Sequence, residues 1–357
     1  MTFKKRYASH SYEWLFSIRG FFVALALTLL VACERPAEFY TLSGSTMGTT
    51  WNATLVLPSG SELQQQQLLT GIESLLEAVN DSMSTYRNES EISRFNLSPE
   101  DQWFSVSTDF YVVLSAALAV GRQSGGAYDI TVGPLVNLWG FGPKGLVFEP
   151  PPAEAITDVK QRVGQDYLRL NGDSRSLKKS ADVYLDFSSI AKGFAVDKIA
   201  RWLDDQGIAD YLIEVGGEMR VAGMSPRGDA WRVAIEQPDM GRLDVASAIR
   251  LSNTGVATSG DYRNYFEAEG VRYSHSIDPR TGYPVAHELV SVTVVHPSAM
   301  LADAWATALT VLGAEDAWSV ALEQGLAVYL IQRDGDGFSS RYTDAFAPML
   351  EELPTQY

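Results

Sequence analysis

Two oxygen-bearing side chains four residues apart could hold a hard metal ion. Asp303 and Thr307 fall in a stretch whose apolar spacing predicts a helix over 299–312, so both side chains lie on one helix face. Mg²⁺ takes oxygen ligands and rarely has a complete cage of protein groups. Spacing alone leaves two interpretations open, because a mildly polar helix face has the same pattern.

A lysine near the start of another predicted helix could bind a phosphate. The segment 186–193 leads into a helix expected over about 190–204, which Ser188 or Ser189 can cap. The free backbone N–H groups and the positive end of the helix dipole, together with Lys192, suit a phosphate or pyrophosphate. A normally capped helix with a solvated lysine is the alternative.

One histidine lies beside a predicted turn, where it could act as a general base. His275 stands shortly before the sequence Asp-Pro-Arg-Thr-Gly at 278–282, which is a turn by composition. A catalytic role and a simple capping contact both remain open for this histidine. His287 and His296 have no such neighbours and are interpreted as structural. The Gly-Gly pair at 216–217 predicts a hairpin between two strands.

Composition and missing motifs exclude several classes of protein. A formal net charge of −16 argues against a nucleic-acid partner, because a phosphate backbone requires a basic surface. A single cysteine excludes a disulfide framework and a zinc site of the CxxC type. The sequence has no GxGxxG, Walker A, GxSxG or HExxH motif, which argues against the usual nucleotide-binding and hydrolase scaffolds.

The first 32 residues have the pattern of an export signal. Basic residues precede an uncharged apolar run at 21–32, which is shorter than the ~20 residues that a membrane span requires. The run ends in Leu-Val-Ala-Cys at 30–33, which matches a bacterial lipobox and predicts lipidation at Cys33. Because Glu34 and not aspartate follows, we expect a periplasmic location with the outer membrane favoured over the inner one. Without residues 1–32 the chain has 24 basic and 43 acidic residues, a net charge of −19.

The mixture of helical and strand patterns predicts an α+β fold, because the two alternate without a strict βαβ order. Residues 33–38 form a tether, 39–345 one catalytic domain and 346–357 a C-terminal tail. The stretch 133–152, rich in Gly and Pro, is expected to be irregular. The other predicted helices lie at about 68–83, 108–121, 153–163 and 314–324. Strands are predicted at about 49–57, within 166–186, and at 210–222, 230–236, 245–251, 262–268 and 290–296, followed by two closing strands.

Eight blocks, in order, give the chain a specific resemblance to a known family. They are TMGTTW at 46–51, STYRNESEISRFN at 84–96, GGAYDITVGPLVNLWGFGP at 125–143, DFSSIAKGFAVD at 186–197, EVGGE at 214–218, ATSGDYRNYF at 257–266, SHSIDPRTGYPV at 274–285 and MLADAWATALTVLG at 300–313. Across about 40–333 the sequence resembles the ApbE family, the FAD:protein FMN transferases, many of which are periplasmic lipoproteins. The resemblance implies T-fold-like mixed sheets with packed helices, in two lobes around an FAD cleft.

The resemblance also implies roles for individual residues. Mg²⁺ would be held by Ser189, through its backbone carbonyl, with Asp303 and Thr307. His275 would be the candidate base beside the reacting phosphate, and Lys192 would contact the pyrophosphate. The remaining residues expected to line the FAD site are Met47, Tyr86, Ala127, Tyr128, Asp129, Asp186 and Ile277.

Three functions are compatible with this set of residues. The first is Mg²⁺-dependent transfer of FMN from FAD to a threonine of exported flavoproteins, such as subunits of a sodium-pumping quinone reductase or an electron-transport complex, with AMP leaving. The second is hydrolysis of FAD to FMN and AMP, and the third is storage of FAD without catalysis. A metal site together with a candidate base argues against storage, which needs neither.

Overall fold

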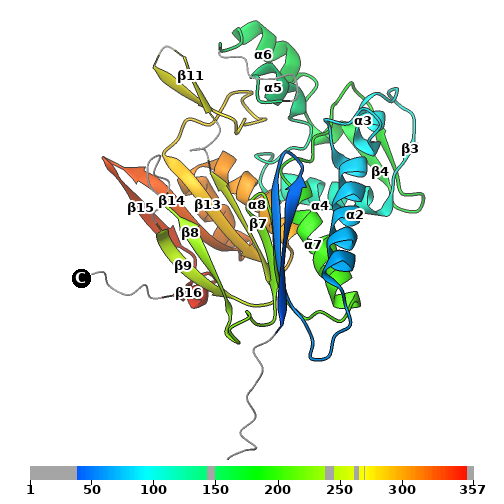
Figure 1. Ribbon diagram of the computed structural model, residues 1–357. Helices are drawn as coiled ribbons and strands as arrows, with labels where there is room; N and C mark the ends of the chain where they lie inside the picture. The colour runs from blue at the N-terminus through cyan, green and yellow to red at the C-terminus, as the bar shows by residue number, and fades with distance from the viewer. Residues whose placement is uncertain (1–37, 143–148, 238–244, 261–264, 269, 352–357) are drawn as a thin grey trace, which may run out of the picture. The chain divides into compact units, whose positions relative to one another are not determined.

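An eight-stranded antiparallel sheet forms the centre of the fold (Figure 1). The computed structural model describes residues 38–142, 149–237, 245–260, 265–268 and 270–351. The strands of the large sheet, in spatial order, are β1 (Phe39–Thr46), β2 (Thr49–Val56), β6 (Asp210–Val215), β7 (Glu218–Ala222), β10 (Thr254–Gly260), β13 (Leu289–His296), β14 (Ala327–Asp334) and β15 (Gly337–Tyr342). Every neighbouring pair is antiparallel.

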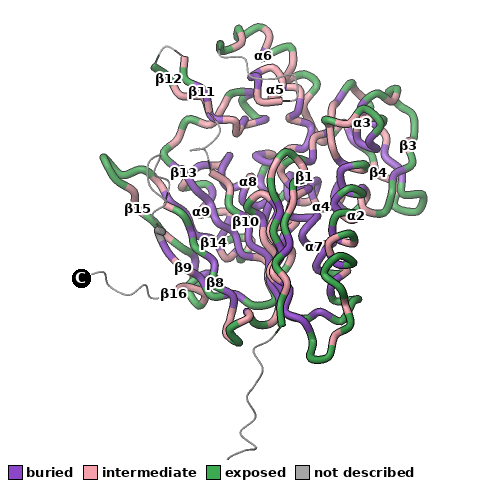
Figure 2. Tube along the Cα trace, viewed as in Figure 1, coloured by how far each residue is buried: buried purple, intermediate pink, exposed green. Residues whose placement is uncertain are grey.

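Both faces of this sheet are buried, and the alternation of side chains along each strand explains how. Val292 and Val294 of β13 join the core that the main helices form, whereas Val295 joins a second core on the opposite face. Val290 also joins the second core, because the register of β13 shifts between Leu289 and Ser291. Seven of the eight β13 residues are buried as a result, while the edge strands β1 and β15 alternate with exposed positions (Figure 2).

Together with strands of the large sheet, four long helices contribute to the larger core. They are α2 (Gln65–Met83), α4 (Thr108–Gln123), α7 (Ala191–Asp205) and α8 (Ala299–Leu312). Helix α8 is rich in alanine and packs on β10 and β13 as well as on α7. Small residues at its first turn allow close packing, because a Cβ added at Gly255 of β10 would lie 2.5 Å from the Cα of Ala299. The helix therefore lies unusually close to the strands beneath it.

Smaller elements complete the fold around this centre. A three-stranded sheet of β16 (Leu350–Glu351), β9 (Val245–Leu251) and β8 (Trp231–Glu236) contributes to the second core. Another contains β3 (Phe104–Ser105), β5 (Ser176–Lys179) and β4 (Leu168–Asn171), and β11 (Tyr265–Ala268) pairs with β12 (Val271–Ser274). The short helices are α3 (Glu91–Asn96), α5 (Gly133–Leu138), α6 (Ala153–Lys160) and α9 (Ala314–Glu323), with 3₁₀ turns at Gln165–Tyr167 and Ala347–Met349.

The structure agrees with the expected α+β class and differs from the sequence predictions in several regions. Strands β1, β10 and β12 and helix α3 were not predicted. Residues 133–138 form a helix, although 133–152 was expected to be irregular; Pro134 lies in its first turn, where proline removes no intrahelical hydrogen bond. Residues 346–351, assigned above to a tail, belong to the fold. The Phe346 ring is fully buried in the second core, and β16 pairs with β9.

The predicted signal at 1–32, Cys33 and most of the predicted tether lie outside the described residues. The compact unit begins at Glu38. Within the part of the chain that the structure describes, no helix is both long and apolar enough to cross a membrane.

Candidate active site

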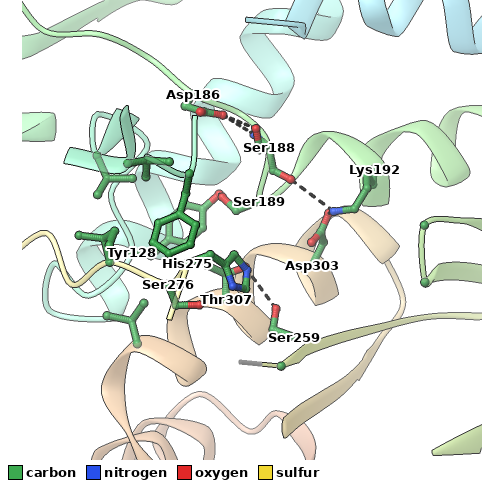
Figure 3. Close-up of a pocket in the computed structure, with 18 of the residues that line it drawn as sticks. Tyr128, Asp186, Ser188, Ser189, Lys192, Ser259, His275, Ser276, Asp303 and Thr307 are labelled. Carbon is green, nitrogen blue, oxygen red and sulfur yellow. Dashed lines mark hydrogen bonds and ion pairs between the residues drawn. The ribbon is translucent and has the colours of Figure 1, made fainter. Parts of the chain in front are cut away.

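A cavity of about 850 Å³ brings together residues that lie far apart in the sequence (Figure 3). Its volume is within the range of small-molecule and cofactor sites. The site residues expected from the sequence that line it are Tyr86, Ala127, Tyr128, Asp129, Asp186, Ser189, Lys192, His275, Ile277, Asp303 and Thr307. Met47 does not line it: this residue sits in the β1–β2 turn with φ +49° and packs against the larger core.

A lysine and two buried carboxylates form the most polar part of the cavity. The Lys192 Nζ lies 3.3 Å from Glu218 Oε1 and 3.9 Å from Asp303 Oδ2, and it donates to the Ser188 carbonyl at 3.3 Å. Glu218 and Asp303 are 5% and 2% exposed. Burial by itself would lower the pKa of Lys192, but the charges of Asp303 and Glu218 outweigh this and raise that pKa, which keeps the side chain an ammonium.

The two carboxyl groups respond to burial in the same direction. Burial raises the pKa of Glu218, with the Lys192 charge opposing the rise and Asp303 adding to it. Burial also raises the pKa of Asp303, against the lowering effects of Lys192 and of the Gly193 N–H. Each of these carboxyl groups therefore gains from a cation placed beside it.

Close contact between α7 and α8 sets the position of Asp303. The Gly193 backbone N–H donates to Asp303 Oδ2 at 3.0 Å. Glycine is required there, because an added Cβ would lie 2.8 Å from the Asp303 Cβ and 2.7 Å from the carbonyl carbon of Ala299. One turn along α7, Asp197 accepts hydrogen bonds from Ser298 Oγ at 2.6 Å and from the Ala299 N–H at 3.0 Å. Two sets of hydrogen bonds thus fix the start of α8 against α7.

Oxygen donors for a hard cation converge at this point. Thr307 is on the same helix as Asp303, and its hydroxyl lies 3.4 Å from that of Ser259. Ser189 donates its hydroxyl to Tyr128 at 3.0 Å, so its backbone carbonyl is the group left for a ligand. A carboxylate, a hydroxyl and a carbonyl are the donor types that Mg²⁺ takes. The residues present therefore fit the metal that the resemblance implies.

The N-terminus of α7 differs from the expected cap. Ile190 occupies the N-cap position and no side chain caps the helix. Ser188 instead donates both its N–H and its hydroxyl to Asp186 Oδ1, which holds the preceding turn. The capping role predicted for Ser188 or Ser189 is therefore wrong, because Asp186 and Tyr128 occupy their hydroxyls.

Two loops on the cavity wall have internal hydrogen bonds that fix their shape. Asp129 accepts from the Thr131 N–H and hydroxyl and from the Gln165 N–H, and burial raises the pKa of this carboxyl against those bonds. The turn at 278–282 is present as predicted: the Gly282 N–H donates to the Asp278 carbonyl at 2.7 Å. His275 stands just before it, its ring edge-to-face with Phe141 at 6.4 Å between centroids.

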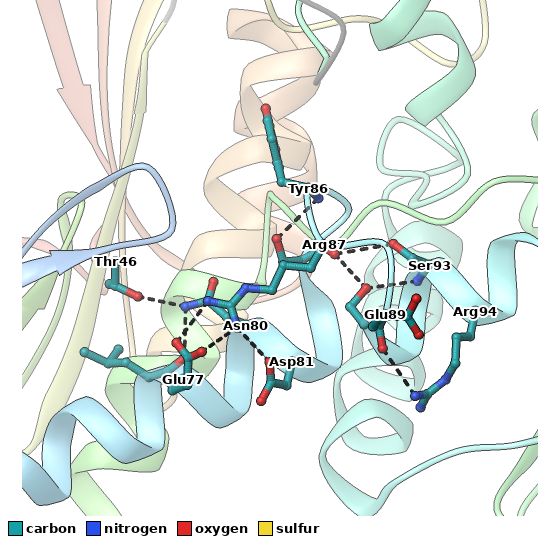
Figure 4. A network of polar contacts seen from close by, with 12 residues as sticks. Thr46, Glu77, Asn80, Asp81, Tyr86, Arg87, Glu89, Ser93 and Arg94 are labelled. Carbon is teal, nitrogen blue, oxygen red and sulfur yellow. Dashed lines mark hydrogen bonds and ion pairs between the residues drawn. The ribbon is translucent and has the colours of Figure 1, made fainter.

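Tyr86 stands at the mouth of the cavity on a loop with its own clamp (Figure 4). Its side chain is 69% exposed. The neighbouring Arg87 binds both carboxylate oxygens of Glu77, at 2.6 and 2.9 Å, and Asp81 at 2.7 Å. The clamp ties the 84–90 loop to the end of α2 and so fixes the backbone that carries Tyr86.

The sequence predictions missed Ser259, Glu236 and Glu218, which line the cavity, and Asp197, which supports it from behind. Glu218 was interpreted only as part of a Gly-Gly hairpin, and the antiparallel pairing of β6 with β7 confirms the hairpin but not that limited role. Asp197 received no role, although its place directly after the apolar residues 194–196 of a predicted helix hinted at an inward-facing carboxylate. The roles of Glu218 and Asp197 both depend on which helix packs beside their own strand or helix, which the sequence pattern alone does not specify.

Comparisons with known proteins agree over nearly the whole chain. The sequence model of the ApbE family matches residues 47–330. The FAD:protein FMN transferase of Vibrio cholerae is 45% identical over 336 residues, covering 94% of this chain and 100% of that protein. The protein of the same name from Escherichia coli is 40% identical over 333 residues, covering 92% and 94%.

Solved structures show the same fold. The flavin transferase ApbE from Vibrio cholerae superposes with a TM-score of 0.83 at 43% identity, covering 88% of this chain and 100% of that one. The apo form of the flavinyl transferase ApbE from Pseudomonas stutzeri gives 0.82 at 38% identity, covering 89% and 98%. With the family match spanning most of the described fold, the chain belongs to the ApbE family.

Proposed function

We propose that this transferase moves FMN from FAD to a threonine hydroxyl of an exported flavoprotein, with Mg²⁺ bound and AMP released. The observation that carries the proposal is the convergence of Lys192, His275, Asp303 and Thr307 on one cavity of about 850 Å³, in a chain 45% identical to a protein named FAD:protein FMN transferase. Acceptors such as subunits of a sodium-pumping quinone reductase or an electron-transport complex fit this chemistry.

The charge of the cavity supports a divalent cation. Among the described residues that line it, Lys192 is the one lysine or arginine, whereas five are acidic: Asp129, Asp186, Glu218, Glu236 and Asp303. An FAD pyrophosphate is itself an anion and would be repelled by this wall. Asp303, Thr307 and the Ser189 carbonyl would hold Mg²⁺, which supplies charge neutralisation on the pyrophosphate and on the departing AMP.

The chain's own groups account for the remaining steps. His275 would take the proton of the threonine hydroxyl, which otherwise is a weak nucleophile; such a base contributes typically ~10²–10⁴-fold. The threonine oxygen then bonds to the phosphorus of the FMN half, and the bond from that phosphorus to the bridging oxygen breaks. That oxygen leaves with AMP, and the Lys192 ammonium balances the negative charge that develops.

Binding of the two halves of FAD would involve the loops on the cavity wall. Tyr86, the 127–129 segment and Ile277 would contact the flavin and adenosine parts, and Asp186 the ribityl-pyrophosphate part. Met47 does not line the cavity, so any effect of this residue on FAD binding would be indirect, through the β1–β2 turn that contains it.

We propose in addition that Cys33 anchors the mature protein to a membrane by a lipid on the periplasmic side, with the outer membrane favoured. The lipobox at 30–33 supports this assignment. Mass spectrometry of the N-terminal peptide tests it: a diacylglycerol-modified cysteine as the first residue is expected, and an unmodified chain that starts elsewhere contradicts it.

The decisive experiment combines purified protein, FAD and Mg²⁺ with an acceptor that carries the threonine site. Fluorescence on the acceptor band of a denaturing gel, with one AMP released per flavin attached, is expected. An acceptor with valine in place of that threonine should stay dark, and Asp303→Ala should abolish the metal-dependent reaction. FMN and AMP released without labelled acceptor would show hydrolysis instead, and FAD retained unchanged would show storage.

A further inference from the structure

Glu218 is a buried acid whose contacts leave half of its carboxylate unused. It is the first residue of β7, directly after the Gly-Gly turn, and lines the cavity at 5% exposure. Its Oε1 pairs with Lys192 at 3.3 Å, while its Oε2 is buried without a hydrogen-bond partner among the described residues. Such an orphaned oxygen is expensive in a protein interior, so its position calls for an explanation.

The contacts of Lys192 indicate what Glu218 does. The ammonium stands between the two carboxylates and lies 0.6 Å nearer to Glu218 Oε1, at 3.3 Å, than to Asp303 Oδ2, at 3.9 Å. Both described contacts of Asp303 use Oδ2, so Oδ1 is the oxygen left for the cavity. A lysine that moved fully onto Asp303 would neutralise this carboxylate and compete with any cation there.

We infer that Glu218 is a positioning residue that holds the Lys192 ammonium away from Asp303 and thereby keeps Asp303 available to a divalent cation. The inference rests on the proposed function, because it concerns the Mg²⁺ that Asp303, Thr307 and the Ser189 carbonyl would hold. Glu218 itself needs no contact with the metal or with FAD to act in this way.

The size of the effect follows from the distances. The distance between Lys192 Nζ and Asp303 Oδ2 is 3.9 Å, and without Glu218 it can shorten to that of a direct ion pair. At an effective dielectric constant of about 20, the stronger attraction between these two charges would weaken the binding of a cation at Asp303 by about tenfold. Glu218→Gln keeps an oxygen that can accept from Lys192, so it should cost less than Glu218→Ala.

The test measures FAD affinity by fluorescence in EDTA and across a Mg²⁺ titration, without an acceptor. For Glu218→Ala, the half-saturating Mg²⁺ concentration should rise by about tenfold, while FAD affinity in EDTA stays within about twofold of that of the unmodified protein. Glu214→Gln is the matched control: it removes an acid from the same hairpin, outside the cavity, and should leave both values unchanged.

A second variant separates positioning from damage to the fold. Combining Glu218→Ala with Lys192→Met removes the competing ammonium, so the half-saturating Mg²⁺ concentration at saturating FAD should return to within about threefold of the unmodified value. A structural defect would not be reversed in this way.

Three results would overturn the inference. One is unchanged half-saturation by Mg²⁺ in Glu218→Ala, and another is failure of the double variant to recover. The third is an FAD affinity of the unmodified protein that does not change with the Mg²⁺ concentration. This third result would also refute the proposed metal dependence, whereas the first two results would be compatible with it.

Discussion

Replacing Gly193 by alanine should disable the site through a shift of one helix. The added methyl carbon would lie 2.7 Å from the Ala299 carbonyl carbon and 2.8 Å from the Asp303 Cβ, whereas ordinary contacts are 3.4–4 Å. Both neighbours belong to a helix and cannot swing aside, so α7 and α8 must separate by about 1 Å, a displacement that can cost about 10²-fold in rate. The overpacking itself should cost about 1–3 kcal/mol of unfolding free energy.

The control for Gly193→Ala is Gly71→Ala. Gly71 lies in α2, and its added methyl carbon would meet the Trp202 ring of α7, at the far end of that helix from the cavity. Urea unfolding should show a smaller loss for Gly71→Ala than for Gly193→Ala, because the Trp202 ring can shift whereas the backbone of α8 cannot. The FMN-transfer gel should show a large loss only for Gly193→Ala. A folded Gly193→Ala protein with an undiminished transfer rate would refute the argument that this contact positions Asp303.

Three further predictions concern groups around the cavity. Arg87→Ala should raise the KM for FAD with kcat little changed, because the loop that carries Tyr86 loses its ion pairs with α2. Salt weakens these exposed ion pairs, so a higher salt concentration should weaken FAD binding in the unmodified protein more than in the variant. Equal salt dependence of the two proteins would contradict this prediction. Asp197→Ala should lower the unfolding free energy by ~1 kcal/mol or more, because the N–H groups of Ala299 and Met300 lose the carboxylate that caps the start of α8, and an unchanged urea midpoint would contradict this. Burial lowers the pKa of His296, so the unfolded chain binds the proton first, and stability falls as pH drops below about 6.5. His296→Gln should flatten that fall in urea midpoints between pH 7.5 and 5.5, because an amide oxygen can accept the Ser298 N–H without titrating; an equally steep fall would contradict it.

Local patterns predicted the long elements well, because their signals lie within the chain segment itself. The helix at 299–312 was predicted with its observed bounds, and alternation of apolar residues located most strands of the large sheet. The helix at 133–138 was missed because Gly and Pro were counted as breakers, although proline in a first turn is compatible with a helix.

Most parts of the site that escaped prediction are those set by tertiary contacts. That Glu218 would face Lys192 and that Asp197 would bind the start of α8 depends on neighbours distant in the sequence. Phe346 was placed in a tail for the same reason, since its burial depends on a sheet that forms elsewhere. The bond from the Ser188 hydroxyl to Asp186 is local, and it was missed because a helix cap was expected there instead.

The strand order has a consequence for how the protein is made. Each strand of the large sheet pairs with one that precedes it in the chain, from β2 through β6, β7, β10 and β13 to β15, so the sheet can grow from one edge while the chain emerges. Helix α8 is synthesised only after six of the eight strands of the large sheet. A nascent chain that stops before residue 299 would have most of its strands but neither Asp303 nor Thr307, so it should lack the proposed metal-binding side chains until most of the chain has been made.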